Sequence, residues 1–208
     1  MADFAGRTAL KGGVIFALFW GAWFEIAKNQ WERRTTLLCG FLGAAASLAV
    51  ARAIALIAPF RERPLVGLAQ FRIPYVTSSE NIIHWSSFPS DHAALYFGVS
   101  VGILLASRRL GIISLLYSLL FISIPRMYVG LHYPSDILAG ALIGTIAVLL
   151  VALAPLVRNT VQRLLRYELH NPSVFYMILF FVTAQLVDMF LELRMMAAFV
   201  LHAIKGLG

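Results

Sequence analysis

Apolar side chains dominate the composition of this 208-residue chain. Hydrophobic residues make up 60% of it and charged residues 13%, whereas soluble domains average roughly 45–50% and 25%. The formal net charge is +7, and the basic residues stand between apolar runs rather than in one cluster. This pattern favours contact with anionic lipid headgroups over contact with nucleic acid. The composition therefore indicates an integral membrane protein and argues against a soluble domain or a nucleic-acid-binding protein.

Six apolar stretches predict membrane-embedded helices. In chain order they cover roughly residues 9–27, 36–58, 92–106, 110–124, 134–157 and 172–187. Backbone groups in lipid are satisfied only within helices or closed barrels, and these runs lack the alternation of barrel strands. We therefore predict an all-α, polytopic membrane helical bundle of about six transmembrane helices, in a single domain over 1–208. The pattern leaves open whether the first stretch and the tail 188–208 span the membrane.

Basic residues mark one end of the expected bundle. They occupy the connections after the first, third and fifth stretches, at 28–34, 108–109 and 158–166. Connections rich in Lys and Arg stay in the cytoplasm, so the intervening ones, 59–88 and 125–133, are expected on the opposite face. Arg61, Arg63 and Arg72 lie there against that bias. An anionic ligand would account for arginines in this position.

Side chains suited to a phosphate ester follow the fourth stretch. Arg126 presents a planar fork that pairs bidentately with phosphate oxygens. If a helix begins at Pro134, Asp136 lies in its first turn and can accept a hydrogen bond from the His132 ring. That bond fixes the tautomer and leaves the other ring nitrogen as a nucleophile. These residues could instead form an interfacial salt-bridge cluster, but ionisable groups at membrane segments are functional by default.

A second histidine stands where the third stretch begins. Ser90 suits the N-cap position of a helix, which places His92 in the first turn. Backbone N–H groups at a helix start bind anions. His92 can therefore protonate a leaving oxygen while nearby amides hold the phosphoryl group.

Three short motifs occur in order along this region. Arg63–Pro64 ends the first, Pro-Ser-Asp-His at 89–92 is the second, and Arg126, His132 and Asp136 form the third. They resemble the KxxxxxxRP, PSGH and SRxxxxxHxxxD motifs of the type-2 phosphatidic acid phosphatase (PAP2) superfamily. The resemblance implies a PAP2-like helical core over about 36–157. It also implies a phosphatase that needs no metal or other cofactor.

The resemblance implies a role for each motif residue. His132 would be the nucleophile that forms a phosphohistidine, and Asp136 would orient it. His92 would be the general acid and then the base that activates water. Arg63 and Arg126 would hold the phosphate oxygens. Ser90 and the backbone amides that follow it would assist them.

The chain departs from the family motifs at three positions. The family lysine of the first motif falls on Leu56, so Arg61 or Arg52 would have to replace its charge. Pro125 replaces the serine of the third motif, which removes a hydrogen-bond donor. Asp91 replaces the glycine of the second, beside the phosphate-binding residues, where a carboxylate costs energy unless an arginine pairs with it. Bacterial undecaprenyl diphosphate phosphatases of this superfamily also carry Asp there.

The predicted function is hydrolysis of a polyprenyl diphosphate, such as undecaprenyl diphosphate, to the corresponding monophosphate. The enzyme would lie in the bacterial plasma membrane with its active site facing the periplasm or the exterior. Phosphatidic acid, phosphatidylglycerophosphate and lipid A are alternative substrates. A non-catalytic lipid-binding or transport bundle is the alternative from another class. The sequence leaves the tail length of the substrate and the oligomeric state open.

Overall fold

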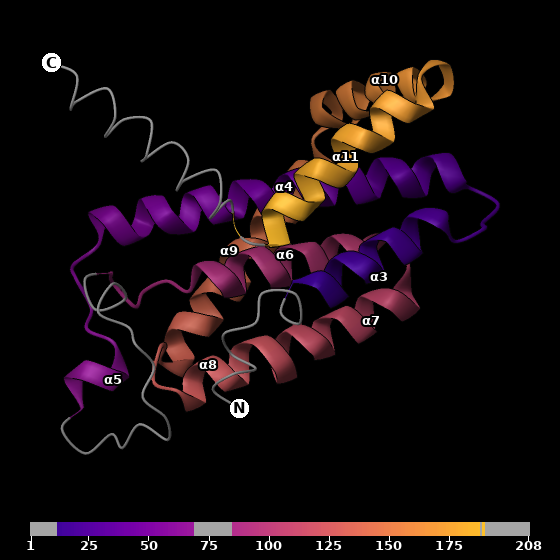
Figure 1. Cartoon of the computed structure of the whole chain (residues 1–208). Helices are drawn as coiled ribbons and strands as arrows, with labels where there is room; N and C mark the ends of the chain where they lie inside the picture. Colours follow the sequence, from indigo (N-terminus) through magenta and orange to yellow (C-terminus); the bar gives the residue numbers. More distant parts are fainter. Residues whose placement is uncertain (1–11, 69–84, 188, 190–208) are drawn as a thin grey trace, which may run out of the picture.

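The computed structural model describes residues 12–68, 85–187 and 189. Within these residues the protein is entirely helical, which confirms the predicted fold class. Arg72 and, apart from Met189, the tail 188–208 lie outside the described residues. The elements, labelled in Figure 1, are α3 (Gly13–Phe24), α4 (Gln30–Ile57), α5 (Pro64–Gly67), α6 (Asp91–Ala106), α7 (Arg108–Tyr117), the π-helix η1 (Ser118–Ser123), α8 (Ile124–Tyr128), α9 (Pro134–Leu153), α10 (Pro155–His170) and α11 (Pro172–Val187).

Each of the six apolar stretches contains an apolar helix. Three helical runs are long and apolar enough to cross a membrane, namely Gln30–Ile57, Arg108–Tyr128 and Pro134–Leu153. The other three apolar helices are shorter, namely Gly13–Phe24, Asp91–Ala106 and Pro172–Val187. The helices α4, α6 and α9 pack together at the centre of the bundle. The short α6 is the most enclosed of them, because most of its side chains are buried.

Small residues bring the three central helices close together. A Cβ atom added to Gly144 of α9 would lie 2.2 Å from the carbonyl oxygen of Ala94 on α6. One added to Gly140 would lie 2.3 Å from the carbonyl oxygen of Ser90. Only a residue without a side chain permits these approaches, as at other small-residue helix contacts in membranes. Gly140 and Gly144 therefore allow α9 to pack closely against α6.

The helical run 108–128 changes geometry before it reaches the third motif. Ser118–Ser123 is π-helical and directly precedes α8, which holds Pro125. A proline ring clashes with the ordinary α-helical ladder one turn before it, and π-helical turns interrupt such a ladder, often at functional sites. The run then ends at Tyr128, and Arg126 lies in its last turn. Arg126 is therefore placed at the end of the bundle where the other motifs lie.

The region after the fifth stretch differs from its prediction. The expected segment 134–157 ends as a helix at Leu153, and a second helix, α10, begins at Pro155. Proline fits the first turn of a new helix and disrupts the end of an old one. Apolar side chains such as Val161 and Leu165 lie on the buried face of α10, whereas Arg163 and Arg166 are exposed. The expected basic connection is thus an amphipathic helix.

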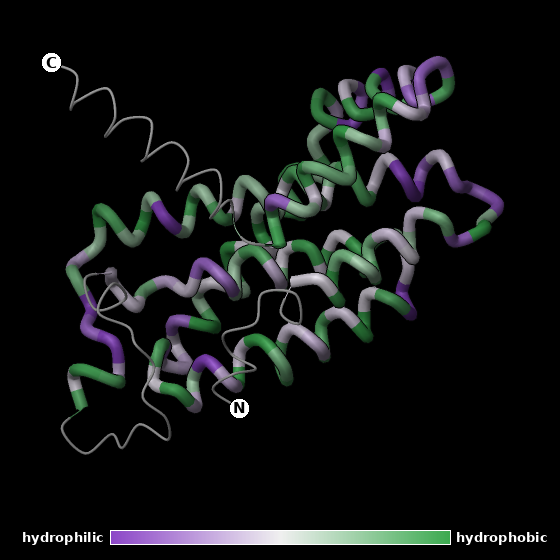
Figure 2. Tube along the Cα trace, in the orientation of Figure 1, coloured by the Kyte–Doolittle hydropathy of each residue, from purple (hydrophilic) through white to green (hydrophobic). Residues whose placement is uncertain are grey.

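Hydrophilic segments gather at the two ends of the bundle (Figure 2). One end holds the α3–α4 turn and α10, where Arg34 pairs with Glu168 at 2.7 Å. Arg158 and Glu32 form a second ion pair there. The other end holds α5, α8 and the connections that carry the three motifs (Figure 1). The basic turns and the motifs therefore lie at opposite ends of the central helices.

Candidate active site

Backbone hydrogen bonds join the three motif regions at one end of the bundle. The N–H of Ser90, the N-cap of α6, donates to the carbonyl oxygen of Asp136 in the first turn of α9 (3.1 Å). The N–H of Leu65 in α5 donates to the carbonyl oxygen of Gly130, between α8 and α9 (2.9 Å). Gly130 has a φ of 73°, a left-handed conformation that suits glycine. These bonds bring residues distant in the sequence into one site.

His132 is held with one ring nitrogen bonded and the other without a partner. Its side chain is 3% exposed, and Nδ1 lies 2.8 Å from the carbonyl oxygen of Ser87. A carbonyl oxygen only accepts, so Nδ1 carries the proton and Nε2 carries the lone pair. Nε2 is buried and has no hydrogen-bond partner among the described residues. The geometry is that of an imidazole prepared to act as a nucleophile through Nε2.

The partner of His132 differs from the one expected. Nδ1 lies 3.9 Å from Oδ2 of Asp136, which is too far for a hydrogen bond. The Ser87 carbonyl oxygen takes that place. A main-chain oxygen leaves no side-chain signal in a sequence. Only the position of Ser87 just before the second motif could have drawn attention to it.

Burial and, after it, the nearby positive charges keep the His132 ring neutral. Burial, followed by the nearby charges of Arg126 and Arg63, lowers the pKa of His132 from 6.5 to about 3. The ring therefore retains its Nε2 lone pair throughout the neutral range. The same two guanidinium groups offer hydrogen-bond donors for an anion brought to that lone pair.

Asp136 organises the start of α9. It is fully buried, and its Oδ2 accepts a hydrogen bond from the N–H of Tyr133 at 2.8 Å. Its Oδ1 pairs with Nη1 of Arg61 at 2.6 Å, and the same nitrogen donates to Ser135. The Arg61 guanidinium also lies over the Tyr133 ring, 4.3 Å from its centroid. The hydrogen bond from Tyr133 to Asp136 thus fixes the connection that carries His132, and the ion pair with Arg61 fixes the Asp136 carboxylate.

Arg63 and Arg126 occupy different hydrogen-bonding situations. Arg63 donates from Nη1 to the Leu131 carbonyl oxygen at 3.0 Å and from Nε to that of Trp85 at 3.3 Å. These bonds fix the guanidinium beside the connection that carries His132. The Nε of Arg126 is buried and has no hydrogen-bond partner within the described part of the chain. A buried donor without an acceptor is costly, and a phosphate oxygen would supply the acceptor.

The second motif begins α6 as expected. The hydroxyl of Ser90 accepts a hydrogen bond from the N–H of Ala93 at 3.3 Å, which confirms it as the N-cap. Asp91 places Oδ1 2.8 Å from Nδ1 of His92. Its Oδ2 lies 3.7 Å from Nη2 of Arg52, on α4. The Asp91 carboxylate is therefore paired with an arginine, as the sequence required.

The sequence left open whether Arg61 or Arg52 replaces the family lysine. In the structure each of them forms an ion pair with a carboxylate, Arg61 with Asp136 and Arg52 with Asp91. Phosphate binding by either arginine therefore stays a prediction.

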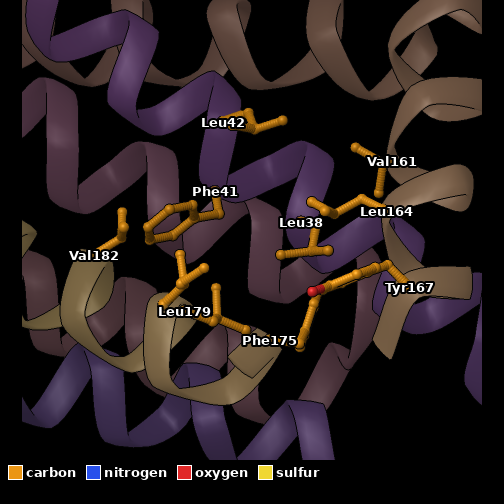
Figure 3. Close-up of a pocket in the computed structure, with 10 residues that line it drawn as sticks. Leu38, Phe41, Leu42, Val161, Leu164, Tyr167, Phe175, Leu179 and Val182 are labelled. Atoms are coloured by element: carbon orange, nitrogen blue, oxygen red, sulfur yellow. The ribbon is translucent and has the colours of Figure 1, made fainter. Parts of the chain in front are cut away.

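An apolar pocket lies away from these residues, between α4, α10 and α11 (Figure 3). Leu38 and Phe41 line it from α4, Leu164 from α10 and Leu179 from α11. Phe41 and Arg52 are separated along α4 by about 16 Å at the helical rise per residue. The pocket lies toward the basic end of the bundle and takes no part in the site.

Across residues 12–68 and 85–187, no group of three or more His, Cys, Asp or Glu side chains could hold a metal ion. The positive charges available to a phosphate in the site described above are those of arginine side chains.

Comparison with protein families places this site in a known class. Residues 60–159 match the sequence model of the PAP2 superfamily. That segment contains the Arg63–Pro64 end of the first motif, the whole of the other two and all of the residues discussed at the site except Arg52. The part of the chain that forms the site therefore matches the PAP2 superfamily.

Among individual proteins, the chain is similar to three bacterial relatives. It is 30% identical over 119 residues to the undecaprenyl-diphosphatase BcrC of Bacillus subtilis, covering 57% of this chain and 56% of the relative. It is 39% identical over 66 residues to the bacitracin transport permease protein BcrC of Bacillus licheniformis, covering 32% of each. It is 44% identical over 59 residues to the lipid A 4'-phosphatase of Bacteroides thetaiotaomicron, covering 27% of this chain and 26% of the relative.

The matched stretches thus span between about a quarter and just over half of these relatives. No solved structure matches the chain.

Proposed function

We propose that this protein is a membrane lipid phosphatase that hydrolyses a polyprenyl diphosphate, such as undecaprenyl diphosphate, to the monophosphate. One observation carries the proposal. The Nε2 lone pair of His132 is buried and without a protein partner among the described residues, and two arginine charges lie near it. The undecaprenyl-diphosphatase named among the relatives supports the choice of substrate.

The first chemical step is attack by His132 on the terminal phosphorus. Nε2 forms a bond to phosphorus while the bond to the bridging oxygen breaks, and the lipid monophosphate leaves. The Ser87 carbonyl oxygen still accepts from Nδ1–H, which stabilises the positive ring of the phosphohistidine. Arg126 and Arg63 hold the equatorial oxygens as negative charge accumulates on them. His92 donates a proton to the leaving oxygen where the leaving group needs one.

The second step releases inorganic phosphate. The neutral form of His92, which has given its proton to the leaving group or to solvent, accepts a proton from water as the water oxygen bonds to phosphorus. The P–N bond breaks, its electrons return to Nε2, and His132 regains its starting form. The cycle needs two histidines with different tasks, which fits their different surroundings. His132 is 3% exposed, whereas the side chain of His92 is 21% exposed and lies at the start of α6.

The proposal includes an orientation in the bacterial plasma membrane. The motif end of the bundle faces the periplasm or exterior, and the end that carries α10 and the basic turns faces the cytoplasm. The separation of these two ends along the central helices supports this arrangement, because basic connections remain on the cytoplasmic side.

Phosphate release from a lipid panel tests the activity. Purified protein in detergent should release inorganic phosphate from undecaprenyl diphosphate, and His132→Ala should reduce this by at least about 10³-fold. A radiolabelled terminal phosphate should appear on the wild-type protein as an acid-labile, base-stable adduct. His202→Ala is a matched control, since that histidine lies outside the motifs. Equal activity of wild type and His132→Ala would rule out the proposed nucleophile.

The same panel separates the alternatives. The lipid A 4'-phosphatase among the relatives favours a lipid monophosphate as the second candidate substrate. Faster turnover of lipid A or phosphatidic acid than of undecaprenyl diphosphate would establish it. Binding of these lipids with no phosphate release from any of them would instead indicate a binding or transport protein.

A further inference from the structure

The carboxylate of Asp91 holds the ring of the neighbouring histidine. Asp91 is the first residue of α6, and its Oδ1 accepts a hydrogen bond from the backbone N–H of His92 at 2.8 Å. The same oxygen lies 2.8 Å from Nδ1 of the His92 ring. A single oxygen thus engages both the main chain and the ring, which fixes the rotation of the ring. Proton transfer to or from substrate then takes place through Nε2.

The second oxygen of Asp91 faces another helix. Oδ2 lies 3.7 Å from Nη2 of Arg52, which projects from α4. Because α4 and α6 pack tightly at the centre of the bundle, this contact ties the carboxylate to a rigid element. The three side chains form a row in which Arg52 contacts Asp91 and Asp91 contacts His92. Arg52 and His92, the first and last residues of this row, are partly exposed and lie at the motif end of the bundle.

We propose that Asp91 and Arg52 are positioning residues for His92, and that their opposite charges set how readily His92 gives up its proton. The inference rests on the proposed function, in which His92 is the general acid and base. It also explains why this chain tolerates a carboxylate where the superfamily motif has glycine. The carboxylate contacts His92 and Arg52, so its role is to position the general acid His92 and not to bind the phosphate.

The charges around His92 give the two positioning residues opposite effects. Arg126 on α8 and Arg63 before α5 add positive charge to this site, whereas the His132 ring is uncharged in the neutral range. Asp91 opposes them, so removing its charge makes the His92 imidazolium lose its proton at lower pH. Arg52 partly neutralises Asp91, so removing Arg52 acts in the opposite direction.

The test is the pH dependence of kcat/KM on a lipid monophosphate, whose alkoxide leaving group needs the acid. In Asp91→Asn the amide oxygen can still accept from Nδ1, while the charge is gone. Its alkaline limb should move to lower pH by about one unit, the lower end of the effect of a nearby opposite charge. The alkaline limb of Arg52→Met should move to higher pH. On a diphosphate, whose leaving group needs little acid, both variants should show smaller losses in kcat.

A matched control removes a carboxylate of the same kind elsewhere. Glu32 lies in the first turn of α4 and pairs with Arg158 at the opposite end of the bundle. Glu32→Gln should leave the alkaline limb where it is in the wild type. If Asp91→Asn also leaves it there, the positioning role of Asp91 is overturned, even where its thermal unfolding midpoint falls.

The outcome for Arg52 is equally decisive. A raised KM with an unmoved alkaline limb in Arg52→Met would show that Arg52 binds the substrate phosphate, and would overturn its part of the inference. Failure of the proposed function is a separate result. In that case the wild-type protein releases no phosphate from either lipid, before any variant is compared.

Discussion

Two buried nitrogen atoms define the site at the scale of single residues. Nε2 of His132 and Nε of Arg126 both lack a hydrogen-bond partner among the described residues. One offers a lone pair and the other an N–H donor, so a phosphorus atom and one of its oxygens would satisfy both. Buried polar groups without a hydrogen-bond partner lower the stability of a folded protein. A bound phosphate would supply the missing partners.

The guanidinium fork of Arg126 gives the first prediction. Arg126→Lys should lower kcat/KM by about 10²-fold or more, because an ammonium group keeps the charge but not the planar, bidentate donors. Initial rates across substrate concentrations measure the loss. Arg109→Lys, in the first turn of α7, is the matched control and should retain wild-type rates. A comparable loss in both variants would mean that a general effect on folding, rather than the loss of the fork at Arg126, is responsible.

The second prediction concerns stability in acid. The pKa of His132 is about 3 in the folded protein against 6.5 ordinarily. Between these values the unfolded chain binds a proton that the folded protein does not, so the free energy of unfolding decreases as pH falls below about 6.5. At pH 5 the loss from this residue should be about 2 kcal/mol. Thermal unfolding in detergent between pH 7 and 5 measures it.

Two histidine variants isolate that effect. His132→Asn removes the titrating ring, so its unfolding midpoint should fall less between pH 7 and 5 than that of the wild type. His170→Asn, at an exposed histidine of α10, controls for the loss of a histidine outside the site. Identical slopes for all three proteins would show that His132 does not titrate as its surroundings require.

Elements differ in how far the sequence predicts them. The six apolar stretches and the proline at the start of α9 follow from composition and local steric rules, and the structure contains them. The π-helical turn before Pro125 and the break at Pro155 depend on how a chain accommodates proline within or between helices. The sequence offered two prolines there but no means of choosing between a kink and a new helix.

The site shows the same division. Motif spacing predicted His92, His132 and Asp136 as site residues because side-chain chemistry is visible in a sequence, and the structure brings the segments that hold them to one end of the bundle. The bond from His132 to the Ser87 carbonyl oxygen was missed, because main-chain oxygens are present at every position. The pairing of Asp91 with Arg52 depends on which faces of α4 and α6 meet. That choice belongs to tertiary packing and is not encoded in either segment alone.

The glycine contacts between α6 and α9 give the third prediction. Gly144→Ala would place a Cβ atom 2.2 Å from the Ala94 oxygen and 2.9 Å from the Gly98 nitrogen. Both are backbone atoms, so the helices must separate, at a cost of about 1–3 kcal/mol. The thermal unfolding midpoint should fall. Activity should fall as well, because the start of α9 carries Asp136.

A second glycine-to-alanine change controls for the loss of glycine itself. A Cβ atom at Gly21 in α3 would meet only the side chain of Leu110, at 3.7 Å, an ordinary contact. Gly21→Ala should leave both the midpoint and the activity close to wild type. A midpoint for Gly144→Ala equal to that of Gly21→Ala would contradict the tight packing of α6 on α9.

At the scale of the whole bundle, most hydrophilic segments of the described residues lie at its two ends (Figure 2). Single-cysteine labelling tests the proposed orientation in a Cys39→Ala background, which removes the one native thiol. A cysteine at Tyr128, exposed near the motif end, should react with a membrane-impermeant reagent added outside intact cells. A cysteine at Asn159, exposed on α10, should react only after the cells are opened. The reverse pattern would contradict the orientation.

The position of the motifs at one end of the central helices has a consequence for enzyme kinetics. In the proposed orientation, residues at this place would meet molecules already dissolved in the lipid or detergent phase rather than molecules arriving from bulk water. The relevant concentration is then the mole fraction of substrate within the surface. Adding inert detergent at a fixed total amount of substrate should slow the enzyme by surface dilution, and adding buffer should not.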